Sequence, residues 1–282
     1  MKIAVISDLH ANFEATKAVY ANVNQWQPDF VVVAGDIINR GPRPLECLEF
    51  VLEKKNTDNW TLLRGNHEDY VITWDRPTHW LCGHAAEVHR ASRWTYRRLH
   101  SDVSALYTMP FQHSIWGPDG REIRFAHASM INNRDGIYPE TNEALLFHKV
   151  RADYPRPRPA LFCVGHTHRP LIRRVDDILI VNAGSSGLPF DLNWRPSYAQ
   201  LSWINNRWKA EIVRVNYDIS KAEKDFKTTG YIEDAGPLAK LVLIELLEAR
   251  SMLYHWVIEF QKPVLNGDIN MEDSVKQFLN EY

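Results

Sequence analysis

The chain has 282 residues, a formal net charge of −2 and 45% hydrophobic residues. This length can bury a sizeable core, as one large domain or as a domain with an appendage. The nearly neutral charge argues against a protein that coats nucleic acid, so we do not expect nucleic acid as a partner.

The cysteines and the apolar runs indicate the compartment. Cys47, Cys82 and Cys163 form neither a Cys-x-x-Cys pair nor an even disulfide framework, which favours a reducing cytoplasm. The segment before Ser7 has too few apolar residues for a signal peptide. The most apolar later stretch, residues 241–247, is short and contains a glutamate, so we expect no membrane span and no membrane partner.

Strands and helices alternate through residues 1–70. Continuous apolar runs at 2–6, 30–34 and 60–63 are typical of strands that are buried on both faces. A helix capped by Asn12 is predicted after the first strand, and another over about 44–55 after the second. This order predicts a parallel sheet with right-handed crossovers.

The middle of the chain returns to strands after a helical stretch. Residues 70–109 have a helical pattern, and the run 122–126 predicts a strand. A helix over about 140–151, an extended proline-rich connector at 154–159 and a buried strand at 161–164 should follow.

The last third changes its pattern twice. Short strands with turn signals between them, predicted at 171–175, 178–182, 198–204 and 208–215, favour antiparallel hairpins. The loop 182–187 either lies beside a site or is an ordinary loop. From about residue 220 the chain is predicted to be helical, with one long apolar helix over about 237–260. This apolar helix should pack on the preceding domain or on a partner subunit, so a homo-oligomer stays possible.

Five predicted strands end in side chains that bind metals. These are Asp8 and His10, Asp36, Asn66 with His67, His127, and His166 with His168. Since the carboxyl ends of parallel strands meet at one edge of a sheet, these groups can converge. A single histidine after a strand is usually structural, but a whole series of such donors is not expected by chance.

These motifs resemble those of the calcineurin-like metallophosphoesterase superfamily. The resemblance covers roughly residues 1–215 and rests on Asp8-Leu9-His10, Gly35-Asp36, Gly65-Asn66-His67-Glu68, Ala126-His127-Ala128 and Gly165-His166-Thr167-His168. Residues 35–42 and 63–68 are similar to the phosphoprotein-phosphatase and diadenosine-tetraphosphatase branch, although Asn39 replaces a frequent aspartate there. The paired His166 and His168 are similar to the bacterial phosphodiesterase branch.

The resemblance implies an architecture and two metal sites. Residues 1–218 would form a catalytic four-layer α/β/β/α sandwich. Residues 219–282 lie outside the resemblance, and their helical pattern predicts a C-terminal extension packed on that domain. Two metal ions, manganese, iron or zinc, would be held by Asp8, His10, Asp36 and His168 and by Asp36, Asn66, His127 and His166. Asp36 would bridge the ions, which at roughly 3.5–4 Å apart can activate a bridging hydroxide for attack on phosphorus.

Further residues receive roles in the reaction. His67 is predicted to be the general acid, because a departing alkoxide needs a proton. Arg40 is predicted to hold the substrate phosphate and to act in catalysis, with Asn66 as a further substrate contact. Arg64 is either another phosphate contact or part of a structural ion pair.

The predicted function is a dinuclear metal-dependent phosphoester hydrolase. Its substrate would be a phosphomonoester, a nucleotide, a phosphoprotein or a phosphodiester. One alternative is a dinucleoside polyphosphate hydrolase, and another is a catalytically silent scaffold of the same fold. Support for a nucleic-acid-binding module comes only from scattered arginines, which a solvated basic edge explains equally well: Arg151, Arg156, Arg158, Arg173 and Arg174.

Overall fold

The structure is a computed structural model that describes residues 1–76, 81–151 and 157–282. Arg156 and the first half of the predicted connector at 154–159 lie outside these residues.

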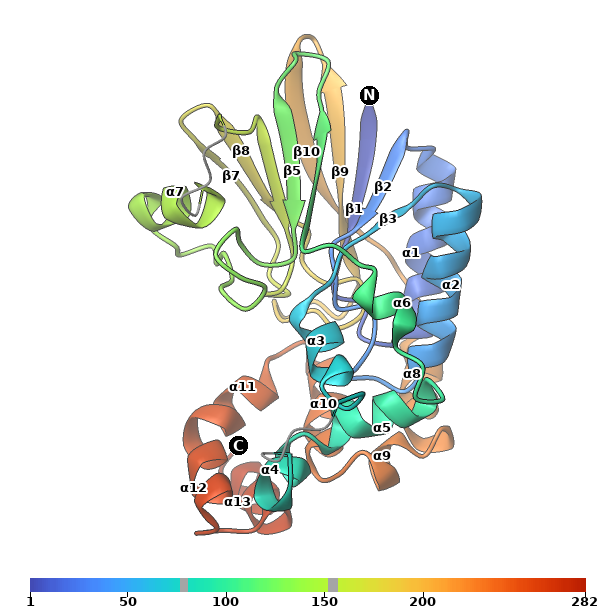
Figure 1. The fold of residues 1–282 in the computed structure, drawn as a ribbon, viewed down its shortest axis with the longest axis vertical. Helices are drawn as coiled ribbons and strands as arrows, with labels where there is room; N and C mark the ends of the chain where they lie inside the picture. Colours follow the sequence, from blue (N-terminus) through green and yellow to red (C-terminus); the bar gives the residue numbers. More distant parts are fainter. Residues whose placement is uncertain (77–80, 152–156) are drawn as a thin grey trace.

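Two mixed five-stranded sheets form the centre of the molecule (Figure 1). The first has the order β10-β9-β1-β2-β3, with β1 (Lys2–Ile6), β2 (Phe30–Val33), β3 (Thr61–Leu62), β9 (Ser197–Ile204) and β10 (Arg207–Arg214). The second has the order β4-β5-β6-β8-β7, with β4 (Gln112–Trp116), β5 (Glu122–Ala126), β6 (Leu161–Val164), β7 (Leu171–Val175) and β8 (Ile178–Asn182).

The parallel pairing predicted for the first seventy residues holds within the first sheet. There β1 pairs with β2 and β2 with β3, all parallel, whereas β9 joins β1 antiparallel. The expectation that the ligand-bearing strands share one parallel sheet is wrong. The later strands β5 and β6 pair in the second sheet, because the hairpin of β4 with β5 starts a new sheet instead of extending the first.

Helices cover the outer faces of both sheets. On the first sheet lie α1 (Phe13–Trp26), which the Asn12 side chain caps, and α2 (Pro44–Thr57), while α7 (Glu143–Arg151) covers the second (Figure 1). Fully buried side chains such as Val5, Phe125 and Cys163 fill the space between the sheets. The predicted four-layer α/β/β/α sandwich is therefore confirmed.

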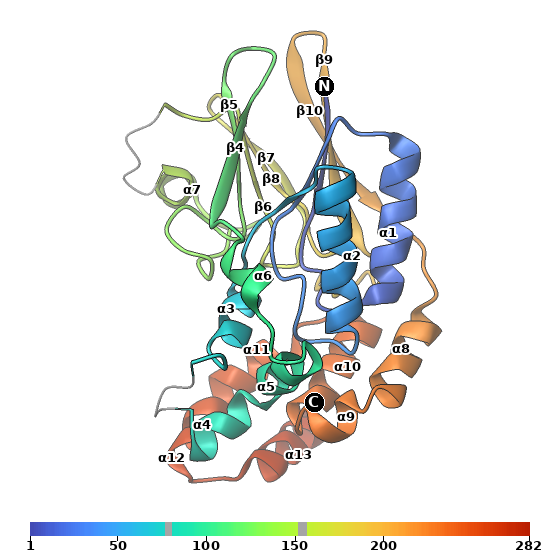
Figure 2. The same cartoon turned by 45° about the vertical axis from the view of Figure 1, so that its right-hand side comes forward.

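Two sets of helices lie together below the sheets (Figure 2). The first set is α3 (Asn66–Ile72), α4 (Gly83–Val88), α5 (Arg90–Arg98) and α6 (Ser104–Tyr107). The second is α8 (Ile219–Thr228), α9 (Tyr231–Asp234), α10 (Leu238–Glu248), α11 (Met252–Trp256), the π-helix η1 (Val257–Gln261), α12 (Lys262–Asn266) and α13 (Met271–Glu281). They share one core that includes Trp94, Tyr231 and Trp256, so the C-terminal helices pack against the first set, and α8 also contacts α1.

The single long helix predicted over about 237–260 is wrong. The chain leaves helical geometry at Ala249, whose φ is 52°, and resumes with α11. The Glu245 carboxylate accepts hydrogen bonds from the backbone N–H groups of Met252 and Leu253, both at 2.9 Å. This tertiary cap stabilises the start of α11 and replaces the helical bonds that are lost at the break. Among the described residues, we find no helix with the combined length and apolarity that crossing a membrane requires.

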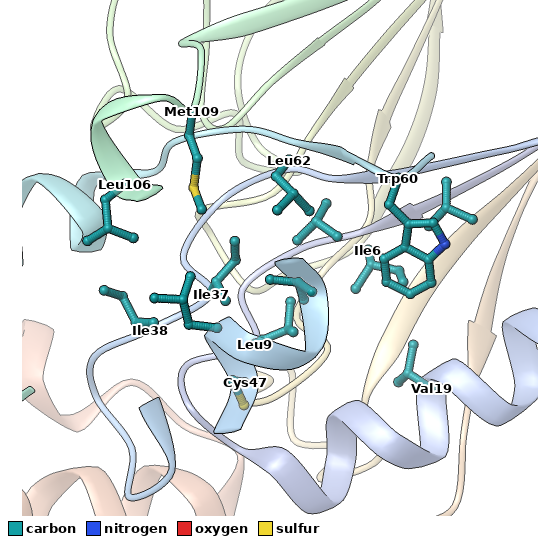
Figure 3. Packing of buried hydrophobic residues seen from close by; sticks show 14 of the residues in the cluster. Ile6, Leu9, Val19, Ile37, Ile38, Cys47, Trp60, Leu62, Leu106 and Met109 are labelled. Carbon is teal, nitrogen blue, oxygen red and sulfur yellow. The ribbon is translucent and has the colours of Figure 1, made fainter. Parts of the chain in front are cut away.

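A hydrophobic core anchors the loop that follows β2 (Figure 3). Ile37 and Ile38, directly after Asp36, are fully buried and belong to the same cluster as Leu9 and Met109. Such packing fixes the loop backbone and therefore the position from which the Asp36 side chain projects.

Candidate metal centre

The strand-end side chains from both sheets converge in the structure. Their potential ligand atoms form two groups, one of Asp8, His10, Asp36 and His168 and one of Asp36, His127 and His166. Within each group all ligand atoms lie within 4.8 Å of one another. Asp36 belongs to both groups, as a bridging ligand would.

In the first group two imidazole nitrogens face a carboxylate. His10 Nε2 lies 3.0 Å from His168 Nε2, and His168 Nε2 lies 3.3 Å from Asp8 Oδ1. His10 Nε2 also lies 3.6 Å from Asp36 Oδ2. Asp8 and His168 come from different sheets, so this group spans the two sheets at their edge.

The second group is centred on His127 Nε2. This atom lies 3.3 Å from Asp36 Oδ2, 3.0 Å from Asn66 Oδ1 and 3.2 Å from His166 Nδ1. Asn66 therefore stands with the second group, where the resemblance expects it.

Each of these histidines uses its other ring nitrogen on a backbone carbonyl. The pairs are His10 Nδ1 with Asn39 O at 3.2 Å, His127 Nδ1 with Ala34 O at 2.8 Å, His166 Nε2 with Arg134 O at 3.0 Å, and His168 Nδ1 with Leu188 O. Because a carbonyl only accepts, the nitrogen that faces it must carry the proton. In the neutral rings, the nitrogens that face the carboxylates therefore present lone pairs, which is the usual arrangement of metal-binding histidines.

The donor set fits positively charged ions. Asp8 Oδ1 is buried and has no hydrogen-bond partner in the described part of the chain, although burying an unpaired carboxylate oxygen is costly. Carboxylate oxygens, an amide oxygen and imidazole nitrogens all point lone pairs into the same small volume. Such a mixed oxygen and nitrogen set suits manganese, iron or zinc.

The pKa shifts of His127 and Asp36 show the same demand for positive charge. Burial alone would lower the pKa of His127, but the charge and hydrogen bond of Asp36, the charge of Asp8 and the Ala34 carbonyl together raise it to about 10. Burial would raise the pKa of Asp36, but His127 and His67 hold it well below its usual range. Burial, followed by the charges of His168 and His67, lowers the pKa of His10 well below its ordinary value. Since a proton and a metal ion compete for the same lone pair, this field also favours a cation.

The ligand loops have an unusual backbone. Several residues adopt positive φ values: Asp8, His10, Asp36, His166 and His168 among the predicted ligands, and Asn39 and Arg40 nearby. Backbone strain of this kind persists only where the surrounding structure enforces it, and it concentrates at functional sites. At Gly65 a Cβ atom would lie only 2.1 Å from Asp36 Oδ1, so the approach of the two loops requires glycine.

Glu68 joins two of these loops, and the sequence analysis did not predict this role. Its carboxylate accepts hydrogen bonds at 2.8 Å from the backbone N–H groups of Asp36, Ile37 and Gly65. Burial and then the charge of Asp36 raise the pKa of Glu68 to about 7. The signal in the sequence was the position of Glu68 three residues after Gly65, the spacing at which a capping-box glutamate accepts from the N-cap backbone N–H.

His67 lies beside the two donor groups and is held by Asn39. The Asn39 side-chain amide contacts His67 Nδ1 at 2.9 Å, and the Thr95 hydroxyl donates to Asn39 Oδ1 at 3.4 Å. Thr95 thus orients the amide so that its N–H group donates to Nδ1, which leaves the proton of the neutral ring on Nε2. Burial is the main cause that lowers the pKa of His67 to about 3, opposed by Asp36 and supported by Arg40. The role of Asn39 was not apparent from the sequence, because Thr95 and His67 reach it from other elements.

The two arginines with predicted substrate contacts have different surroundings. Arg40 packs over the Phe190 ring at 6.0 Å and, among the described residues, has no ion-pair or hydrogen-bond partner. Arg64 Nε lies 3.1 Å from Asp69 Oδ1, in the ion pair that was the alternative for this residue. Arg64 is not among the described residues that line the cavity beside Asp36 and Asn66.

The loop 182–187 braces the first group. The Ser185 hydroxyl donates to the Asp8 carbonyl at 2.7 Å, and the Asn182 amide donates to the Gly165 carbonyl at 2.8 Å. Leu188, directly after the loop, accepts the hydrogen bond from His168. Of the two alternatives left by the sequence, the position beside the site is correct.

Two cavities open from the centre. The first, of about 350 Å³, is lined at one end by Asp36, Asn66 and His67 and extends between α5 and the C-terminal helices. The second, of about 680 Å³, shares Arg40, His166 and Tyr254 with the first and runs over segments that follow β5, β6 and β8. Arg40 is thus exposed to both cavities, and the metal ligands are accessible to a small molecule.

Comparisons with known sequences agree with this site. A sequence model of calcineurin-like phosphoesterases matches residues 1–172. An uncharacterized protein of Methanocaldococcus jannaschii is 29% identical over 238 residues, which cover 78% of this chain and 89% of that protein. A shorter match of 74 residues, 35% identical, covers 26% of this chain and 26% of a symmetrical bis(5'-nucleosyl)-tetraphosphatase from Actinobacillus pleuropneumoniae.

Solved structures have the same fold. A metallophosphoesterase from Sphaerobacter thermophilus is 26% identical, with a TM-score of 0.65 over 88% of this chain and 100% of that chain. A hypothetical protein from Pyrococcus horikoshii has a TM-score of 0.73 at 18% identity, covers 89% of this chain, and is similar in fold alone.

Proposed function

Since the chain belongs to the calcineurin-like phosphoesterase family and is a metallophosphoesterase, we propose that it hydrolyses small phosphomonoesters with the help of two metal ions. The observation that carries the proposal is the pair of donor groups that share Asp36 at the end of a cavity. A cavity walled by helices admits a small ester more readily than a folded phosphoprotein.

The residues present fit two cations. Asp8, His10, Asp36 and His168 would hold one, and Asp36, Asn66, His127 and His166 the other. Bound together, such ions supply Lewis acidity and a hydroxide nucleophile at neutral pH. Manganese, iron and zinc all suit the donors, and manganese is the first to test.

The surrounding residues would bind phosphate and hold a proton. Arg40 has its guanidinium unpaired among the described residues, which supports a role in gripping phosphate oxygens with two parallel hydrogen bonds. His67 carries its proton on Nε2, 4.0 Å from Asp36 Oδ2, where it can donate to a departing oxygen. Its lowered pKa means that the neutral imidazole, rather than the imidazolium, would be the donor.

Dinucleoside polyphosphate hydrolysis is the second candidate. The short match to a symmetrical bis(5'-nucleosyl)-tetraphosphatase favours it, as does the second cavity, which Arg40 and Arg169 both line. A catalytically silent scaffold is disfavoured, because none of the donor positions has lost its ligand.

From the sequence we also propose a cytoplasmic location and a homo-oligomer. The location is supported by a cysteine pattern without a disulfide framework, and the homo-oligomer by the apolar character of the C-terminal helices.

The test is a substrate screen on purified protein with added manganese. Phosphomonoesters, phosphodiesters, diadenosine tetraphosphate and a phosphoserine peptide should be compared at equal concentration. We expect the highest kcat/KM for small monoesters. A clear preference for the tetraphosphate would establish the second candidate, and no hydrolysis of any substrate would refute both.

A further inference from the structure

The first cavity continues beyond the metal ligands into an apolar chamber. This chamber lies between α4 and α5 on one side and α10, α11 and η1 on the other, and in Figure 1 α10 lies next to α5. Its apolar lining residues are Val88, Ala91, Leu238, Val242, Leu253 and Trp256. The C-terminal helices therefore supply much of the wall of a cavity whose other end holds the reacting groups.

Among the described residues, the lining of the chamber supplies no counter-charge for an ionised group. Asp36 and Arg40, both at the metal end, are the only Asp, Glu, Lys or Arg residues among the described residues that line the cavity. His89 also lines it, and burial followed by the charge of Arg134 lowers the pKa of its ring, so it is neutral. A further phosphate or carboxylate would lose hydration here without gaining an ion pair, which is unfavourable.

The walls are fixed before any ligand enters. The Tyr231 ring packs edge-to-face against Trp94 and Phe226, at centroid distances of 5.0 and 5.3 Å. Trp256 is fully buried, and its indole N–H donates to Ser274 Oγ at 3.2 Å. A wall that is already packed loses little entropy when it binds a rigid apolar group.

A π-helix lies at this wall. Val257 and Gln261, the first and last residues of η1, both line the cavity. Short π-helical segments are uncommon and are often found at functional sites. This local geometry is a second feature, independent of the apolar lining, that points to a ligand at the chamber.

We propose that the apolar chamber binds the leaving group of the substrate, and that this group is uncharged and aromatic. The inference rests on the proposed function, because the metal end of the same cavity would hold the phosphate. It narrows the substrate class to phosphate esters of aryl or similarly flat apolar alcohols. A polyphosphate chain would place charge in the chamber, which its lining disfavours.

Two esters with leaving groups of similar acidity test the proposal. With manganese present, kcat/KM for 2-naphthyl phosphate should exceed that for phenyl phosphate by about 10-fold or more, as expected when extra apolar surface is buried in a pocket. Val257→Trp should remove this preference, because Val257 is 41% exposed and lines the cavity mouth, where an indole would occupy the chamber. Ile258→Trp is the matched control, since Ile258 is 63% exposed and is not among the cavity-lining residues.

Binding without turnover separates this inference from the proposed function. The fluorescence of 2-naphthol should report binding to wild-type protein and to Ile258→Trp, and much weaker binding to Val257→Trp. If neither ester is hydrolysed but this binding pattern is observed, the chamber is supported and the proposed function fails. Equal kcat/KM for the two esters in the wild type, or a preference that survives Val257→Trp, would overturn the chamber while leaving phosphoester hydrolysis intact.

Discussion

Asp36 is the residue on which both donor groups depend. Its carboxylate lies near His10 and His127, and its Oδ1 atom also accepts a hydrogen bond from the His67 backbone at 2.9 Å. Asp36→Asn removes a negative charge that both cations would share. We expect it to lower bound manganese and to reduce kcat by more than about 100-fold, because even outer-shell changes lower activity 10–100-fold.

Metal analysis and kinetics on the same preparation check this prediction. Asp69→Asn is a suitable control, because Asp69 pairs with Arg64 outside both donor groups. Normal metal content and turnover in Asp36→Asn would show that Asp36 is not the bridge.

Arg40 is the residue that tests the phosphate contact, and Arg64 serves as its control. Arg40→Ala should lower kcat/KM roughly 10- to 100-fold, the effect of losing a charge-assisted contact, with the metal retained. Arg40→Lys should recover little, since lysine cannot form the bidentate contact. Arg64→Ala should keep kcat/KM within a few-fold, because its partner is Asp69. Wild-type efficiency in Arg40→Ala would exclude the phosphate contact.

Asn39 is predicted to hold His67 in its neutral Nε2–H form. In Asn39→Asp a carboxylate would accept a hydrogen bond from Nδ1, which favours the imidazolium and raises the pKa of His67 above its value of about 3. The ¹⁵N shifts of the His67 ring, followed against pH, should therefore show the second proton bound at higher pH in the variant than in the wild type. Identical titration curves would mean that Asn39 does not set the protonation of the ring.

At the level of elements, the junction of α10 and α11 depends on Glu245. Its buried carboxylate caps Met252 and Leu253, so Glu245→Ala leaves two backbone donors without their partner. We expect a loss of roughly 2–4 kcal/mol in the free energy of unfolding. The control Glu248→Ala, at an exposed position of the same helix, should change it by less than about 0.5 kcal/mol. An equal effect of both substitutions in urea denaturation would contradict the cap.

The pH dependence of this cap has a definite sign. Burial raises the pKa of Glu245, although the charge of Arg40 opposes the shift. Protonated Glu245 therefore makes its full contribution to the free energy of unfolding below the ordinary glutamate pKa. This contribution is lost as the pH rises through the raised pKa of the folded state. Glu245→Gln, which cannot ionise, should become more stable relative to the wild type over that rise. A stability difference that does not vary with pH would refute the shift.

The sequence predicted elements best where local pattern and tertiary environment agree. The buried strands and the donor side chains directly after them were recognisable, because an apolar run followed by Gly-Asp or Gly-Asn-His carries its own local signal. The break at Ala249 was not, because alanine is a strong helix former and the cap from Glu245 is a tertiary contact.

At the scale of the whole molecule, the sandwich positions the ligands and the helices enclose the site. The two sheets meet at the edge where Asp8 and His168 face each other. The short motifs and the reasoning from strand ends both predicted this convergence, but the strands belong to two sheets instead of one. The wall made by α10, α11 and η1 was not predictable, because apolar residues that line a cavity and apolar residues that fill a core have the same pattern in a sequence.

The central claim is that two metal ions bound by these donors hydrolyse phosphoesters. The most direct measurement is the hydrolysis of phenyl phosphate by chelator-treated protein as manganese is added back, with bound metal counted per chain. The account predicts no activity without metal and a maximum at two ions per chain. Full activity after complete removal of metal, or a maximum at one ion per chain, would contradict it.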